Sequence, residues 1–252
     1  FIFQHSLHNP MRLNATILSM QSTHFAFAFL GGLIPALFWL WFWLREDRER
    51  PEPLLLIAVA FIGGMMVVPI ALPLQQLAMN SYNGFTLNFV WVIIEEFLKY
   101  GIALMIILWN RAVDEPIDVI IYMIAVALGF ASLENALFIF NAMNDTSTAT
   151  SLVTGKLRFM GPTLLHVLAS GTVGVCVAFA YYSNNLTKVA AGLFGLCLAV
   201  ILHALFNFFI MGRSGETILS VFLFVWMGII VLMLIFEKIK ILEVRHLSTN
   251  RT

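Results

Sequence analysis

The stretch LLLIAVAFIGGMMVVPIALPLQQLAM, residues 54–79, decides the fold class of this chain. It contains no charged side chain, and it is longer than the roughly 20 apolar residues that a helix needs to cross a bilayer. Backbone polar groups cannot stay unpaired in lipid, and the stretch lacks the alternating pattern of a membrane barrel. The sequence therefore predicts a transmembrane helix here.

Working outward from this stretch, the rest of the chain has the same character. Of its 252 residues, 60% are hydrophobic and only 11% are charged, which excludes a soluble globular domain. The formal net charge is zero and gives no support for a nucleic-acid partner. Six further apolar runs are long enough to span a membrane: 25–44, 85–109, 117–142, 161–182, 189–211 and 218–236. The sequence predicts an all-α, polytopic membrane helix bundle of about seven transmembrane helices.

The apolar runs also define the domain organisation. Residues 25–236 form the predicted transmembrane domain, residues 1–24 are an N-terminal segment that is a candidate for trimming, and residues 237–252 are a predicted cytoplasmic tail. With the N-terminus outside, the inner segments hold nine Lys and Arg residues and the outer segments hold four. The positive-inside rule therefore predicts a multi-pass protein of the cell membrane with its N-terminus outside and its C-terminus in the cytoplasm.

Six charged or histidine side chains lie well inside these apolar runs, away from their ends. A charge at the bilayer centre costs about 2.5–3.5 kcal/mol on insertion scales, so such residues are expected to be functional. An ion pair that only locks the bundle is the structural alternative, and a lone intramembrane histidine often serves only to join two helices. The six residues are Glu95, Glu96, Lys99, Glu134, His166 and His203.

Their spacing suggests a shared polar site. Glu95, Glu96 and Lys99 fall within about 100° of arc on one helix, and adjacent carboxylates are suited to general acid or base chemistry. In the predicted topology, the polar residues of four spans lie roughly 8–15 Å below the outer surface. Unrelated structural polar residues would be scattered along the spans, so this common depth predicts one site.

Four short motifs in these spans resemble those of the PrsW family of membrane proteases, which is related to the type II CAAX prenyl endopeptidases and the bacterial Abi proteins. The acidic, proline-containing segment EDRERPEP, residues 46–53, is similar to the segment that follows the first span in that family. The motifs are E-E-x-x-K at Glu95, Glu96 and Lys99, F-x-x-x-E-N at Phe130, Glu134 and Asn135, a histidine with small residues at His166, and H-x-x-x-N at His203 and Asn207.

The resemblance implies a signalling protease that is embedded in the membrane. The expected substrate is a membrane-anchored protein such as an anti-sigma factor, cut first at or near the extracytoplasmic side. The expected catalytic residues are Glu95, Glu96, Glu134, His166, His203 and Asn207, and the supporting residues are Lys99, Phe130 and Asn135.

Two chemistries fit these residues. In the first, Glu95 activates water without a metal, and His203 and Asn207 stabilise the oxyanion. In the second, a zinc ion is held by histidines and a carboxylate, with His166, His203 and Glu134 as candidate ligands. We favour the first, because the sequence lacks an H-E-x-x-H motif.

Three other functions fit part of the pattern. Intramembrane Glu, Lys and His residues also build proton relays, so a proton-coupled transporter or channel is the main alternative, although we find no internal repeat. A non-catalytic membrane scaffold could use the same pocket for binding. Cleavage of prenylated CAAX proteins is disfavoured, because the second motif carries Glu134 rather than a histidine and the site faces outward.

Overall fold

The computed structural model describes residues 10–47, 50–109, 112–145, 161–210 and 215–249. This part of the chain is helical and contains no strand. Its helices are α2 (Pro10–Glu46), α3 (Leu54–Met79), α4 (Gly84–Trp109), α5 (Pro116–Asp145), α7 (Pro162–Phe179), α8 (Asn185–Ile210) and α9 (Gly215–Thr249).

The helices are long enough for a multi-pass membrane protein. Within the described ranges, six of them have the length and hydropathy to cross a bilayer. The remaining helix, α4, is 26 residues long but carries Glu95, Glu96 and Lys99 near its middle. The predicted fold class, an all-α membrane bundle, is therefore confirmed.

Predicted and observed boundaries agree best for α3, whose two ends match the predicted run. The first and last of the described helices are longer than predicted: α2 already begins at Pro10, and α9 continues to Thr249. Helical hydrogen bonding does not depend on apolar side chains, so a helix can continue beyond the bilayer into polar sequence. Residues 146–160, which follow α5 in the sequence, lie outside the described residues.

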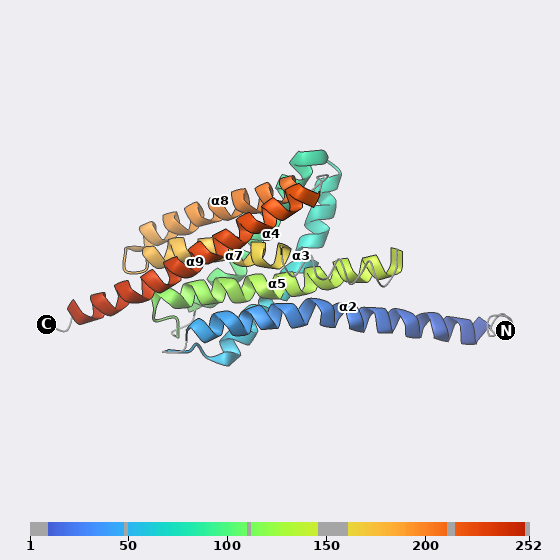
Figure 1. Cartoon of the computed structure of the whole chain (residues 1–252), viewed down its shortest axis with the longest axis horizontal. Coiled ribbons are helices and arrows are strands. Elements are labelled where there is room, and N and C mark those ends of the chain that lie inside the picture. Colours follow the sequence, from blue (N-terminus) through green and yellow to red (C-terminus); the bar gives the residue numbers. More distant parts are fainter. Residues whose placement is uncertain (1–9, 48–49, 110–111, 146–160, 211–214, 250–252) are drawn as a thin grey trace.

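Helix α5 is the centre of the bundle. Its most apolar stretch is 94% buried, compared with 72% for α7 and 28–39% for α2, α3, α8 and α9. It packs against α2, α3 and α7, and Figure 1 shows it running between α2 and the group formed by α7, α8 and α9. Side chains carried by α5 and α7 are therefore placed inside the protein and away from lipid.

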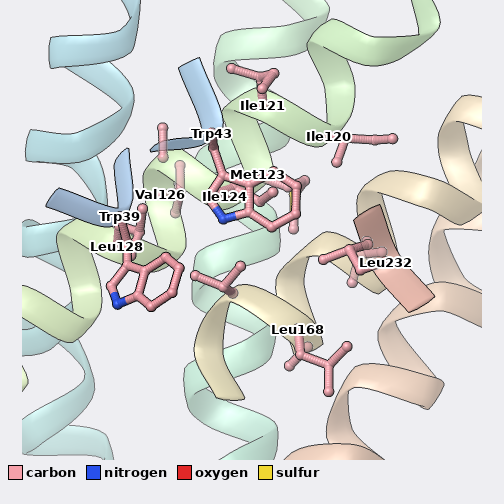
Figure 2. Close-up of a cluster of buried hydrophobic side chains, with 14 of the residues drawn as sticks. Trp39, Trp43, Ile120, Ile121, Met123, Ile124, Val126, Leu128, Leu168 and Leu232 are labelled. Carbon is pink, nitrogen blue, oxygen red and sulfur yellow. The ribbon is translucent and has the colours of Figure 1, made fainter. Parts of the chain in front are cut away.

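Aromatic side chains join α2 to α9 on one side of this core. The ring of Trp39 meets Trp226 at 5.8 Å between centroids, and Trp43 meets Phe236 at 5.8 Å. Figure 2 shows both tryptophans among the aliphatic side chains of α5 and, beyond them, Leu168 and Leu232. These contacts join α2 and α9 beside the core helix α5.

Two glycines allow α3 and α5 to cross in backbone contact. A Cβ on Gly129 would lie 1.8 Å from the carbonyl oxygen of Phe61, and one on Gly64 would lie 2.0 Å from that of Val126. Small residues at helix crossings are a common device of membrane proteins, because they let backbones approach closely. This crossing determines how the polar residues of α5 are presented to the neighbouring helices.

We expect Gly129→Ala to lower the free energy of unfolding by about 1–3 kcal/mol, because the new methyl group forces the two backbones apart. Gly101→Ala is the matched control, since nothing lies within 4 Å of its Cβ position and alanine is the better helix former. Thermal unfolding in detergent micelles measures both. Equal melting temperatures for the two variants would contradict the close crossing.

Candidate active site

Helix α4 contributes three buried charged side chains to the polar site. Glu95, Glu96 and Lys99 are 8%, 2% and 0% exposed. The ammonium group of Lys99 donates to Glu96 Oε1 at 2.6 Å, and it also lies 4.8 Å above the ring of Phe130. The spacing of three residues brings the two charges onto one side of the helix. Lys99 therefore compensates the charge of Glu96 within the membrane.

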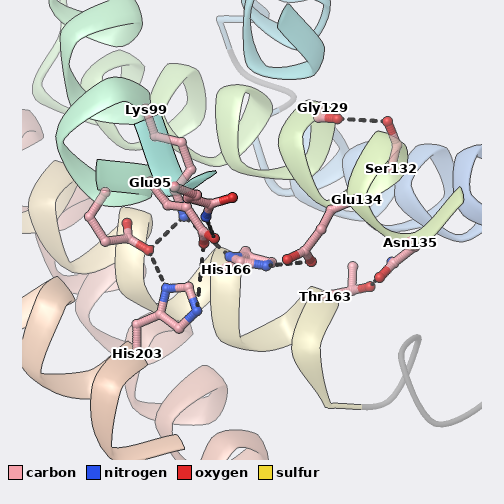
Figure 3. Close-up of polar contacts among 11 residues, drawn as sticks. Glu95, Lys99, Gly129, Ser132, Glu134, Asn135, Thr163, His166 and His203 are labelled. Atoms are coloured by element: carbon pink, nitrogen blue, oxygen red, sulfur yellow. Dashed lines mark hydrogen bonds and ion pairs between the residues drawn. The ribbon is translucent and has the colours of Figure 1, made fainter. Parts of the chain in front are cut away.

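His203 brings α8 to the same group. Its Nδ1 lies 2.7 Å from Glu96 Oε1, and its Nε2 lies 3.8 Å from Glu95 Oε2. Glu96 thus contacts both Lys99 and His203. Figure 3 shows the side chains of Glu95 and His203 directed toward each other. The consequence is that one imidazole nitrogen is held by Glu96 while the other faces Glu95.

His166 connects α7 to both α4 and α5. Its Nδ1 lies 3.2 Å from the Lys99 ammonium, and its Nε2 lies 3.2 Å from Glu134 Oε2. The ring also packs edge to face against Phe130 and His203, with 5.0 Å between centroids in each case. Since the lysine ammonium can only donate, Nδ1 accepts and Nε2 carries the proton toward Glu134.

Seven of the nine predicted residues meet in this cluster, and the other two lie beside it. Asn135 points toward α7, where its side-chain nitrogen donates to Thr163 Oγ1 at 2.8 Å. Asn207 lines a cavity between α4 and α8 instead. The seven residues that gather are Glu95, Glu96, Lys99, Phe130, Glu134, His166 and His203.

The cluster lies closer to one end of the bundle. His166 follows the start of α7 at Pro162 by four residues, and His203 precedes the end of α8 at Ile210 by seven. At 1.5 Å per residue, these positions are roughly 6 and 10 Å from the helix ends. Both ends are on the side where α2 begins (Figure 1).

Gln75 was not among the predicted site residues, but the structure places it in the site. Its side-chain nitrogen donates to Glu95 Oε1 at 2.8 Å, and its carbonyl oxygen accepts from Trp91 Nε1 at 3.0 Å. The polar pair Gln75 and Gln76 in an otherwise apolar span was the available signal. Because Oε1 of Glu95 is occupied, the buried Oε2 faces His203 without a hydrogen-bond partner among the described residues.

A metal ion is compatible with part of this arrangement. One donor atom each from Glu95, His166 and His203 lies within 4.8 Å of the others. Two histidines and a glutamate are a familiar ligand set of catalytic zinc, and each histidine has a carboxylate neighbour of the kind that orients metal ligands. However, both ring nitrogens of His166 already contact Lys99 or Glu134, so His166 would have to release one of them to bind an ion.

The arrangement has the groups that hydrolysis of a peptide bond requires. Glu95 offers an unpaired carboxylate oxygen, and His203 offers a nitrogen beside it. A buried lysine and two further carboxylates surround this pair and fix the orientation of the imidazole rings. Such fixed polar groups in a site of low dielectric are effective in catalysis.

Comparisons with known proteins agree with this chemistry. A family model described as "PrsW family intramembrane metalloprotease" matches residues 52–235, a range that includes every residue of the cluster. The chain is 30% identical to Protease PrsW of Clostridioides difficile (strain 630) over 192 residues, which is 73% of this chain and 79% of that protein.

Two further relatives have the same name. Protease PrsW of Oceanobacillus iheyensis is 27% identical over 194 residues, or 75% of this chain and 85% of the relative. Protease PrsW of Bacillus subtilis (strain 168) is 25% identical over 189 residues, or 73% and 83% of the two chains. No solved structure matches the chain. The extent of these matches shows that the chain belongs to the PrsW family of intramembrane proteases.

Proposed function

We propose that this chain is an endopeptidase that cuts membrane-anchored proteins at or near the extracytoplasmic face of the membrane, as in the first cut of an anti-sigma factor. The observation that carries the proposal is the buried pair of Glu95 Oε2 and His203 Nε2, 3.8 Å apart and supported from four helices. Glu95 Oε2 is buried and makes no hydrogen bond within the described part of the chain, so it can accept a proton from a water molecule.

The proposed orientation follows from the distribution of charge. Helix α2 begins and α9 ends at opposite ends of the bundle (Figure 1), as expected for an odd number of crossings. In the predicted topology, nine Lys and Arg residues belong to the segments on the C-terminal side of the membrane and four to the segments on the N-terminal side. The positive-inside rule then places the start of α2, and with it the nearby site, on the outer side.

In the mechanism we propose, Glu95 acts as the general base. A water molecule donates a proton to Glu95 Oε2 while its oxygen attacks the peptide carbonyl carbon. The proton then passes to the leaving nitrogen as the C–N bond breaks. His203 stabilises the developing oxyanion as an imidazolium, which donates Nδ1–H to Glu96 and Nε2–H to the oxyanion. Lys99 keeps Glu96 ionised and His166 correctly oriented.

Zinc-assisted hydrolysis is the second candidate, and the closeness of Glu95, His166 and His203 favours it. When bound there, zinc would supply Lewis-acid activation of water. Glu134, whose side chain is 20% exposed, would then be the carboxylate that takes up the proton. We prefer the metal-free mechanism because the Lys99 ammonium lies 3.2 Å from His166 and would repel a cation.

The decisive experiment compares wild type and Glu95→Gln in matched membranes. New protein N-termini are identified by mass spectrometry, and we expect fragments cut close to the outer membrane boundary with wild type only. Such fragments would also name the substrates. Equal fragment profiles, with both proteins folded and inserted, would contradict the protease assignment of this site and would favour a transporter or a binding scaffold.

Treatment of the purified, active enzyme with 1,10-phenanthroline is expected to leave its rate of cleavage unchanged. The metal content, measured by inductively coupled plasma mass spectrometry, should be well below one zinc per chain. The physical reason is that Lys99 already provides the positive charge beside His166 and Glu96. Loss of activity with the chelator and its recovery on addition of zinc would instead establish the zinc-assisted mechanism.

A further inference from the structure

A cavity of about 290 Å³ lies between the first half of α4 and the last third of α8. Its walls are largely aromatic, and Phe85 and Phe208 meet edge to face at 5.6 Å on its border. Phe85 is 60% and Phe208 44% exposed, so this border faces the lipid. The lining residues are Gly84, Phe85, Asn88, Phe89, Ala204, Asn207 and Phe208.

The cavity is next to the catalytic cluster. Asn88 precedes Glu95 by seven residues, which places both on the same face of α4, roughly 10 Å apart along the helix. On α8, Ala204 directly follows His203, and Asn207 follows it by one helical turn. The cavity therefore borders the lipid-facing surface between α4 and α8, and its lining continues along both helices toward Glu95 and His203.

Two amide side chains distinguish this cavity from its neighbours. Asn88 donates to the carbonyl oxygen of Gly84 at 3.1 Å through its nitrogen, and Asn207 lines the opposite wall. A larger cavity of about 400 Å³ between α8 and α9 has only Ser220 among apolar side chains. An amide offers both a donor and an acceptor, which is the complement of a peptide group. A lipid acyl chain has no hydrogen-bonding groups to pair with these amides, whereas a peptide backbone has both N–H and C=O groups.

The chemistry of intramembrane cleavage requires such groups. A peptide bond within a helix has its N–H and C=O engaged in the helix, so the segment must unwind before water can attack it. In lipid, the freed backbone groups would cost several kcal/mol each unless the enzyme satisfies them. Amides placed on the path to the catalytic pair meet this need.

We propose that the cavity between α4 and α8 is the lateral entry and binding site for an unwound segment of a substrate's transmembrane helix, with Asn88 and Asn207 hydrogen-bonded to its backbone. This inference rests on the proposed function and adds to it the form in which the substrate binds. Asn88 is then a substrate-binding residue, and the aromatic border formed by Phe85 and Phe208 is the entrance for the substrate.

Photo-cross-linking tests the entry route. In the Glu95→Gln background, p-benzoylphenylalanine replaces either Phe85 at the cavity or Phe97, a 63% exposed residue of the same helix that does not line it. The probes are the substrates identified in the Glu95→Gln comparison, that is, the membrane proteins that are cut by wild type and not by Glu95→Gln. We expect their intact forms to cross-link at position 85 and not at position 97. Equal yields at the two positions would overturn the proposed entry route.

Kinetics with one of these substrates tests the role of Asn88. In reconstituted vesicles, Asn88→Ala should raise KM by about tenfold and leave kcat within about twofold, because the lost hydrogen bonds serve binding. Asn88→Gln should recover part of the loss. Thr86→Ala, on the same helix and outside the cavity lining, is the control and should match wild type.

The outcomes separate the two levels of the proposal. If fragments depend on Glu95 but Asn88→Ala does not change KM, the binding site is overturned and the protease assignment stands. The same holds if Asn88→Ala loses activity only in proportion to a loss of melting temperature. If no fragment depends on Glu95, the proposed function fails and the binding site fails with it.

Discussion

Glutamine in place of Glu95 is expected to lower the rate of substrate cleavage by about 10³-fold or more, with little change in stability. The substitution keeps the size of the side chain and lets its carbonyl oxygen accept from Gln75. It removes the basic Oε2 that faces His203 Nε2. Loss of a general base typically costs 10²–10⁴-fold, and a site that depends on one carboxylate falls at the upper end. The measurement is the rate of fragment formation at equal amounts of inserted protein.

Two further substitutions of glutamate by glutamine are compared with Glu95→Gln. Glu134→Gln should cost less, about 10- to 100-fold, because Glu134 acts through the orientation of His166. Glu237→Gln, at a 55% exposed side chain of α9 that pairs with Lys240, should leave cleavage unchanged. If Glu134→Gln were the more damaging of the two site variants, Glu134 rather than Glu95 would be the base.

Methionine in place of Lys99 is expected to destabilise the protein by about 3–5 kcal/mol. The side chain is fully buried, and its ammonium lies between Glu96 and His166. Removing one partner of a buried ion pair leaves an uncompensated charge, which costs far more than the pair itself contributes. Methionine keeps an unbranched side chain at this position and removes only the ammonium group, including its contact with the Phe130 ring, so the loss measures the charge. Unfolding in detergent micelles and the yield of inserted protein report the effect.

The double variant Lys99→Met with Glu96→Gln is the control for this interpretation. Replacing both charges removes the uncompensated carboxylate, so most of the stability should return. Cleavage should nevertheless remain low, since His203 loses the carboxylate that holds its Nδ1. A single variant as stable as wild type would show that the charge of Glu96 does not depend on Lys99.

The sequence by itself determined the helices and identified most of the polar cluster. The run 54–79 matches α3 at both ends, because a long apolar segment in lipid has to satisfy its own backbone and a helix does so. Glu95, Glu96, Lys99, His166 and His203 stood out because charged or ionisable groups at membrane depth are costly without a function. The shared motifs then indicated the family, which the comparisons confirmed.

Only the tertiary structure decided how these residues are paired. The close crossing at Gly64 and Gly129 and the packing of α7 on α5 fix the rotation of each helix about its own axis. This rotation brings Gln75 to Glu95, directs Asn135 to Thr163 and places Asn207 in a cavity. Periodicity along one helix predicts which side chains share a face, but it carries no information on which neighbouring helix that face meets. That choice depends on packing between segments far apart in the chain, which is why it became visible only in the folded bundle.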